Sequence, residues 1–305
     1  MIPGHDHITV CICTYKRPQM LAHLLRKIQE QQTAQLFTCS IVVVDNDHDE
    51  SARIIVNSFA EESPIQIKYY CEPEQNIALA RNKAVLNAKG DLLALIDDDE
   101  YPENNWLLTM YKAIHRYKAH GVLGPVKPYF EEQPPRWVIK GKFYEKPGHK
   151  KHCTGSVLKW WDTRTSNVLL RSDIFSESER LFNPALGRGG EDKEFFSRMI
   201  EKGYMFVWCD EAHVIEIIPP SRCKRSFMLK RALLRGKVSL LYPSSGFISN
   251  CKSVVAIFLY TLALPFLFFA GHHIFMRYLT KCFDHIGRLL GVYGFDVIKE
   301  KYVMK

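Results

Sequence analysis

The sequence predicts an α/β fold built around a parallel β-sheet with helices on both faces. Short β-branched runs alternate with amphipathic stretches, polar residues directly follow the runs, and Pro, Asp, Asn or Gly mark the boundaries. Strands that alternate with helices of this length form a parallel sheet, because each crossover returns the chain to the same edge. In such sheets, ligands bind beyond the carboxyl ends of the strands.

The predicted elements are most regular in the first third of the chain. There we expect strands at Ile8–Cys13, Ser40–Asp45, Ile65–Tyr70 and Leu92–Asp97, with helices at Pro18–Gln32, about residues 50–61, and Ile77–Ala88. Further on we expect helices at Asn104–Tyr117 and Glu191–Lys202, strands at Gly121–Val126, Asn167–Leu170 and Met205–Cys209, and a loop-rich stretch at Glu131–Trp161.

Composition places the chain among globular proteins. Hydrophobic residues make up 47% of its 305 positions, which is enough for a sizeable core, and no low-complexity tract suggests disorder. The opening MIPGHDHITV has no basic region or cleavage site, so we expect no secretory signal.

An acidic cluster, Asp97-Asp98-Asp99 followed by Glu100, stands at the end of the apolar run LLALI. Neighbouring carboxylates repel one another, so the cluster is costly unless a positive charge lies beside it. A hard divalent cation that also holds phosphate oxygens would supply that charge. Alternation along an extended chain predicts Asp97 and Asp99 on one side and Asp98 on the other. The alternative is a solvated acidic turn.

Three further motifs follow predicted strands or begin predicted helices. Thr14-Tyr15-Lys16-Arg17-Pro18 opens a helix whose first N–H groups favour an anion, or it is a plain strand-to-helix turn. Asp45 closes the run VVVD. Its carboxylate either accepts a hydrogen bond from a base or ribose, or caps a helix. Asn76-Ile77-Ala78-Leu79-Ala80-Arg81-Asn82 begins a helix, with Arg81 either at the site or a surface cation.

A second acidic pair, Glu191-Asp192, begins the predicted helix at residues 191–202. Repulsion between the two carboxylates raises a pKa, which would suit a general base near neutral pH. The alternative is the ordinary decoration of a helix N-terminus with acidic residues.

In this order and spacing, the motifs resemble glycosyltransferase family 2, whose catalytic domain adopts the GT-A fold, a Rossmann-like arrangement around a mixed sheet. The resemblance covers about residues 6–215 and is carried by TYKRP, VVVDND, NIALARN, LIDDDE and the Gly-Gly-Glu-Asp of residues 189–192. It is closest to bacterial transferases that build polysaccharide or lipid-linked oligosaccharide. Ile77 departs from the family pattern, because many relatives have Gly there.

The resemblance implies a role for each motif. Nucleotide and donor contacts are expected from Thr14, Tyr15, Arg17, Asp45, Asn76, Arg81, Asp97 and Asp98. Asp97 and Asp99 would hold a divalent cation, Mn²⁺ or Mg²⁺. Asp192 would be the general base, and Glu191 would orient the acceptor. For a late polar contact to metal or diphosphate, the candidates are His213, Glu216 and Arg222.

The chain from residue 219 onward is expected to form a helical appendage that associates with a membrane, after a catalytic domain at residues 1–218. Residues 222–237 hold seven Lys or Arg and no acid, a run that attracts nucleic acid, anionic lipid or a phosphorylated substrate. Residues 253–276 then lack charge, which favours lipid and argues against nucleic acid. Pro265 should kink or break this segment, so we expect a bent, re-entrant or interfacial anchor. A buried core helix is the alternative.

The sequence therefore predicts an inverting, metal-dependent transferase that moves a hexose-type sugar from a UDP-sugar to a saccharide acceptor. The acceptor is expected to be lipid-linked, at the cytoplasmic face of the inner membrane, in surface polysaccharide or lipopolysaccharide synthesis. One alternative is a sugar-phosphate nucleotidyltransferase, which would need a Gly-rich loop that TYKRP does not supply. The other is a non-catalytic, membrane-bound protein that binds nucleotide sugars.

Overall fold

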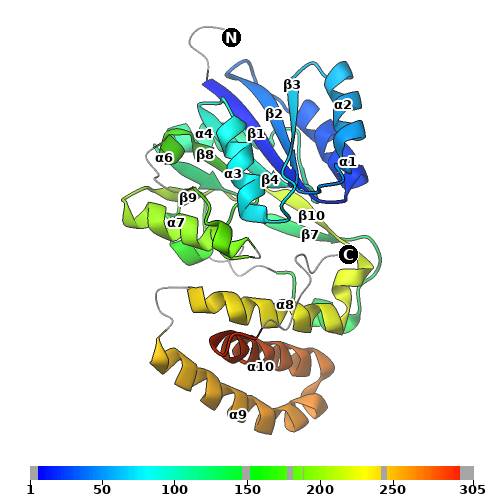
Figure 1. Cartoon of the computed structure of the whole chain (residues 1–305), viewed down its shortest axis with the longest axis vertical. Helices are drawn as coiled ribbons and strands as arrows, with labels where there is room; N and C mark the ends of the chain where they lie inside the picture. Colours follow the sequence, from blue (N-terminus) through cyan, green and yellow to red (C-terminus); the bar gives the residue numbers. More distant parts are fainter. Residues whose placement is uncertain (1–5, 146–151, 177–180, 188, 242–245, 296–305) are drawn as a thin grey trace. The chain divides into compact units, whose positions relative to one another are not determined.

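The computed structural model describes residues 6–145, 152–176, 181–187, 189–241 and 246–295, and it contains two compact units. The first unit takes in the described residues of Met1–Lys127, Pro147–Gly187 and Glu191–Glu216. The second takes in those of Pro128–Lys146, Arg188–Gly190 and Ile217–Lys305. Figure 1 labels most of the helices and strands of both units.

Among the described residues, the main sheet of the first unit has seven strands in the order β3-β2-β1-β4-β8-β6-β9 (Figure 1). Their bounds are β1 Asp6–Thr14, β2 Phe37–Asp45, β3 Gln66–Cys71, β4 Leu92–Asp97, β6 Gly121–Leu123, β8 Val168–Arg171 and β9 Phe206–Trp208. The first four strands run parallel, as the alternating pattern predicts.

The mixed sheet that the resemblance to the GT-A fold implies is confirmed at β8. This strand pairs antiparallel with both β4 and β6, so the sheet is mixed. The rule that alternation gives parallel strands holds only where one crossover helix joins neighbouring strands. Here β8 lies between β4 and β6 in the sheet but follows both in the chain, so it enters from the opposite end.

Helices cover both faces of the main sheet. They are α1 Pro18–Gln29, α2 Arg53–Glu62, α3 Ile77–Asn87, α4 Trp106–Arg116, α6 Asp173–Ser176 and α7 Glu191–Glu201, with 3₁₀ turns η2 Trp160–Asp162 and η3 Pro184–Leu186. Along β4, Leu93 and Leu95 belong to the core shared with α3 and α7. Ala94 and Ile96, which point to the opposite face, are equally buried, so neither face of β4 is open to water.

A smaller sheet has the order β5-β10-β7, with bounds β5 Glu100–Pro102, β10 Val214–Ile218 and β7 Val126–Phe130. It corrects the prediction of one strand at Gly121–Val126, because the chain leaves β6 after Leu123 and begins β7 at Val126. Pro125, between the two strands, has no N–H to donate to a sheet ladder, and this favours the break.

The second unit is helical among its described residues, apart from the strand segments that enter it. Its helices are α5 Arg136–Lys140, α8 Arg225–Val238, α9 Phe247–Ala270 and α10 His272–Val292, with 3₁₀ turns η4 Pro220–Cys223 and η5 Ser239–Leu241. Gly236 and Gly287 allow α8 and α10 to pack closely. A Cβ added to Gly236 would lie 1.9 Å from the Asp284 carbonyl oxygen, and one added to Gly287 would lie 2.1 Å from that of Leu233.

The apolar segment forms one continuous helix, so of the two effects expected of Pro265 the break is wrong and the kink stays a prediction. Proline removes one backbone hydrogen bond but can remain inside an apolar helix when its neighbours compensate. The helix ends before Gly271, whose φ of 136° starts the turn into α10. By length and composition, α9 can cross a membrane, and only 6% of its most apolar 18-residue stretch is buried. A buried core helix is therefore excluded, and α9 fits a membrane-associating appendage.

Candidate active site

Polar residues meet at the carboxyl edge of the parallel strands. In the register of the sheet, Thr14 lies opposite Asp45, and Cys13 lies opposite Asp97. This is the edge at which α/β sheets bind ligands. The strand pattern thus brings three predicted site residues, from β1, β2 and β4, to one edge of the sheet.

The acidic cluster forms a turn between β4 and β5 instead of an extended strand. Arg17 Nη1 lies 3.1 Å from Asp98 Oδ1 and 3.1 Å from Asp99 Oδ2. The Thr14 hydroxyl also donates to Asp98 Oδ2, at 2.8 Å. Asp98 and Asp99 therefore face the same arginine, whereas Asp97 faces Arg81. The expected alternation, with Asp98 opposite the other two, is wrong because the strand ends at Asp97.

Arg81 of α3 connects the acidic cluster with the start of α7. Its Nη1 contacts Glu191 Oε1, and its Nη2 lies 3.4 Å from Asp97 Oδ1. The side chains of Arg81 and Glu191 are 12% and 4% exposed, whereas that of Asp97 is 44% exposed. Asp97 can therefore be reached from solvent, while the Arg81–Glu191 pair is enclosed.

Burial changes the acid–base properties of two of these carboxyls. Desolvation raises the pKa of Glu191 to about 7; Arg81 opposes this rise and the adjacent Asp192 adds to it. Desolvation likewise raises the pKa of Asp98 to about 7, against the opposing effect of Arg17. Perturbed carboxyls of this kind are common at functional sites.

Asp192 stands in the first turn of α7 and is half-buried, so it is more accessible than Glu191. Its Oδ1 accepts a hydrogen bond from the Lys193 N–H at 2.7 Å. The Lys193 ammonium donates to the carbonyl oxygens of Trp161 and Thr163. This contact holds the tryptophan-containing turn η2 beside the start of α7.

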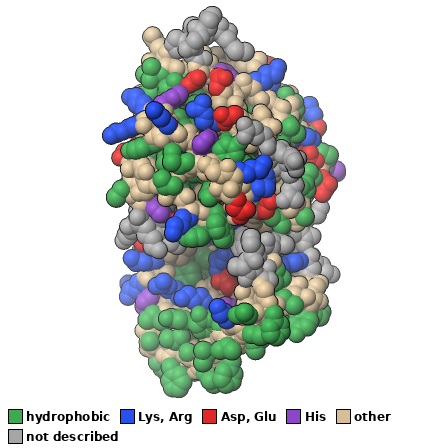
Figure 2. Space-filling view, turned by 90° about the vertical axis from the view of Figure 1, so that its left-hand side faces the viewer, with side chains coloured by type: hydrophobic (Ala, Val, Ile, Leu, Met, Phe, Trp, Pro, Cys, Tyr) green, Lys and Arg blue, Asp and Glu red, His purple; other side chains and the backbone are tan. Residues whose placement is uncertain are grey.

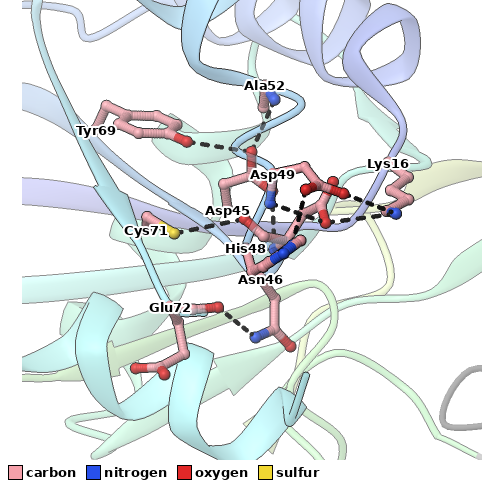
Figure 3. Close-up of polar contacts among 10 residues, drawn as sticks. Lys16, Asp45, Asn46, His48, Asp49, Ala52, Tyr69, Cys71 and Glu72 are labelled. Carbon is pink, nitrogen blue, oxygen red and sulfur yellow. Dashed lines mark hydrogen bonds and ion pairs between the residues drawn. The ribbon is translucent and has the colours of Figure 1, made fainter. Parts of the chain in front are cut away.

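The Asp45 side chain is fully buried and accepts three hydrogen bonds. Its Oδ2 accepts from Ala52 N at 2.7 Å and from the Tyr69 hydroxyl at 3.2 Å, and its Oδ1 accepts from Asp47 N at 3.2 Å. Figure 3 shows Tyr69 and Ala52 on either side of this carboxylate. These contacts account for Asp45 as a turn-forming residue, and base recognition by Asp45 stays a prediction.

Asn76 caps α3 through its side chain. Its Oδ1 accepts from Ala78 N at 3.0 Å and Leu79 N at 3.3 Å, and its Nδ2 donates to the Pro184 carbonyl at 3.0 Å. The cap fixes the start of the helix that carries Arg81. Tyr15 lies half-buried just after β1, with the Lys16 ammonium 5.6 Å from its ring centre.

A second group with oxygen and nitrogen ligands lies beyond β2. In the described part of the chain, Asp47, His48 and Asp49 have ligand atoms within 4.8 Å of one another. Lys16 already places an ammonium group 3.6 Å from Asp47 and 3.5 Å from Asp49, as drawn in Figure 3. A metal ion there would have to compete with this lysine.

Arg164 was not predicted, although it lies among the charges of the site. Its Nη2 donates to the Gly124 carbonyl at 2.7 Å, and its guanidinium lies 5.6 Å from the Trp208 ring centre. Burial lowers its pKa, while the acidic residues Glu100, Glu216, Asp192 and Asp97 oppose that change. Its partners lie far apart in the sequence, so no local motif marks it.

Two of the three candidates for a late polar contact lie on or next to β10, opposite β5. His213 Nε2 lies 3.0 Å from Glu103 Oε1, and Glu216 of β10 pairs in register with Glu100 of β5. Arg222 belongs to the second unit, where its carbonyl accepts from the Tyr144 hydroxyl at 2.9 Å.

Comparison with known proteins assigns the family. Residues 9–202 match the model described as glycosyl transferase family 2. The chain belongs to this family. It is 35% identical over 235 residues to the succinoglycan biosynthesis protein ExoM of Rhizobium meliloti, covering 76% of this chain and 73% of ExoM. It is 25% identical to the glucosyl-dolichyl phosphate glucuronosyltransferase of Haloferax volcanii, covering 78% and 79% of the two chains.

Solved structures of low sequence identity share the GT-A fold. The mannosyltransferase PcManGT of Pyrobaculum calidifontis, solved with GDP-Man and Mn²⁺, matches with a TM-score of 0.66 at 14% identity, over 96% of this chain and 89% of PcManGT. S. aureus TarS 1–349, solved with UDP-GlcNAc, matches with a TM-score of 0.56 at 14% identity, over 96% and 95%. The predicted GT-A fold is confirmed, and the chain is a glycosyltransferase with relatives in polysaccharide biosynthesis.

Proposed function

We propose that this glycosyltransferase moves a hexose-type sugar from a UDP-sugar to a hydroxyl of a lipid-linked saccharide, with inversion at the anomeric carbon. The observation that carries the proposal is the contact of Arg81 with both Asp97 and Glu191. Through Arg81, the acidic turn after β4 lies beside the Glu191–Asp192 pair that begins α7. A site for a nucleoside diphosphate and a site for an acceptor hydroxyl would then be neighbours.

Inversion needs a base but no covalent intermediate. The acceptor oxygen attacks the anomeric carbon, its proton passes to Asp192, and the bond from that carbon to the diphosphate oxygen breaks. Asp192 fits this role because it is half-buried, whereas Glu191 is held by Arg81. In this proposal, Glu191 and Arg81 position the start of α7, and Thr14, Tyr15 and Arg17 lie beside the nucleotide.

The oxygen ligands of the acidic turn suit a hard divalent cation, Mn²⁺ or Mg²⁺. Asp97 and Asp99 would hold it, and when bound it would neutralise charge on the departing diphosphate. Asp97 is partly exposed, which fits this role. Asp97 and Asp99 contact different arginines, so shared binding of one ion requires at least one of these contacts to rearrange.

The second unit supports a location at a membrane. The basic helix α8 and the exposed apolar helix α9 follow one another in the chain, a combination that binds anionic lipid surfaces. We propose the cytoplasmic side of the inner membrane, where a lipid-linked acceptor for surface polysaccharide or lipopolysaccharide would be available. The relationship to a succinoglycan biosynthesis protein supports this pathway class.

The test is hydrolysis of a panel of nucleotide sugars by the purified chain with Mn²⁺. Asp99→Ala and Asp192→Asn should lower turnover by about 10²-fold or more, while Asp173→Asn, at an exposed acid of α6, should leave it unchanged. Turnover of one UDP-sugar that stops when EDTA is added would support the proposal. Release of diphosphate from UTP and a sugar phosphate would instead favour a nucleotidyltransferase. Failure to bind any nucleotide sugar would refute both.

A further inference from the structure

A cavity of about 400 Å³, lined by several charged side chains, lies among α8, α9 and α10 of the second unit. Its lining includes Arg235 from α8, Lys252 from α9, and Asp284, His285 and Arg288 from α10, together with three serines. None of these residues takes part in the proposed transfer reaction. The cavity therefore needs an explanation of its own.

Arg288 is the main reason to expect an anion in this cavity. The residue is only 8% exposed, its Nε donates to Asn250 Oδ1 at 3.0 Å, and its Nη1 donates to Ser239. Its Nη2 is buried and has no hydrogen-bond partner among the described residues. A buried cationic donor without an acceptor is costly, so a bound anion would complete the hydrogen bonding of this guanidinium.

The side chains around the cavity carry more positive than negative charge. Asp284 accepts two hydrogen bonds from Arg235, from Nε and Nη2, each of 3.0 Å, and is thereby neutralised. Within residues 217–241 and 246–295, no acidic side chain forms an ion pair with Lys252 or Arg288. Burial lowers the pKa of His285, which disfavours the cationic form of its imidazole. The two cations, Lys252 and Arg288, match the charge of a phosphate group.

The surface that follows the cavity along α9 is apolar. Lys252 and Ser253 lie in the first third of the helix, and the exposed side chains of Phe258, Leu262 and Phe266 follow. Figure 2 shows hydrophobic side chains gathered over α9, with Lys and Arg side chains in a band beside them. A molecule with a phosphate at one end and a hydrocarbon chain at the other matches both surfaces.

We infer that this cavity binds the phosphate group of a membrane lipid whose hydrocarbon chain lies along α9. The inference goes beyond the proposed transfer reaction and does not depend on it, because the binding requires no nucleotide sugar. A glycerophospholipid and a polyprenyl diphosphate carrier share this chemistry.

The test measures equilibrium binding to the full chain in neutral detergent. The probes are phosphatidylglycerol, a polyprenyl diphosphate, diacylglycerol and inorganic diphosphate. At least one phosphate-bearing lipid should bind about tenfold or more tighter than diacylglycerol, which lacks the charged group. The tighter of the two phosphate lipids identifies the source. If diacylglycerol or inorganic diphosphate binds equally well, the lipid-phosphate assignment is overturned.

Matched variants connect the binding to the cavity. Lys252→Gln should weaken lipid binding about tenfold and Arg288→Gln about 100-fold, the range of charge-assisted hydrogen bonds. Lys281→Gln removes an exposed lysine of α10 outside the cavity and should change nothing. Because Arg288→Gln can disturb packing, Lys252→Gln is the deciding variant. Equal affinities of Lys252→Gln and Lys281→Gln would refute the site, whatever the outcome of the donor-hydrolysis assay.

Discussion

The guanidinium of Arg81 contacts the carboxylate of Glu191, although 110 positions separate them in the chain. The same guanidinium lies 3.4 Å from Asp97 at the end of β4. Both partners of the first contact are nearly enclosed, so water cannot replace either one. This pair therefore links the stability of the first unit to the geometry of the proposed site.

Arg81→Met should lower the free energy of unfolding by about 3–5 kcal/mol at pH 8, because it leaves Glu191 buried without its cation. Adding Glu191→Gln should recover much of this loss, since the buried charge is then gone. Urea unfolding of the wild type, the two single variants and the double variant measures the coupling free energy between Arg81 and Glu191. Arg53→Met, which breaks the more exposed pair with Glu50, should cost at most about 1 kcal/mol. Equal losses for the two arginine variants would contradict this account.

The contribution of Glu191 to stability should depend on pH. Its pKa is about 7 in the folded chain, above the ordinary value of 4.5, so the folded state holds a proton that the unfolded state releases. The contribution of Glu191 to the free energy of unfolding is therefore fully present below about pH 4.5 and is lost as the pH rises through about 7. Glu191→Gln should remove this part of the pH dependence in urea unfolding from pH 4 to 8. A wild-type-minus-variant difference that stays constant across this range would refute the raised pKa.

Asp192→Asn should separate catalysis from donor binding. The substitution keeps an oxygen that can accept from Lys193 N but removes the basic carboxylate. We expect kcat to fall about 10²–10⁴-fold, the usual contribution of a general base. The UDP dissociation constant should stay within about twofold, as measured by calorimetry. A parallel loss of UDP affinity would assign Asp192 to the donor site instead.

Asn76→Ala should destabilise the first unit by about 1–2 kcal/mol, because α3 loses its N-cap. Asn57→Ala, at an exposed position of α2, is the matched control and should change stability by less than about 0.5 kcal/mol. Thermal unfolding compares the two variants. Unchanged stability with weaker UDP binding would show that Asn76 acts on the donor and not on the helix.

Much of the catalytic half could be predicted because its signals are local. β-Branched runs specify β1 and β2, and an apolar run specifies β4. A polar residue that ends such a run lies at the carboxyl edge of a parallel sheet. Thr14, Asp45 and Asp97 were placed at this edge from the pattern alone. The boundary between the two units is harder to predict from the sequence. The second unit includes residues 128–146, which carry no strong periodicity.

By itself, the sequence determined the α/β class, the edge where the site residues gather, and the family, because each depends on short-range pattern or motif order. Only the tertiary structure decided that Asp98 and Asp99 share Arg17, that Arg81 meets Glu191, and that β8 runs antiparallel. It also decided that Arg288 lines a cavity among three helices. Each of these depends on contacts between residues far apart in the chain, and such contacts leave no mark in local periodicity.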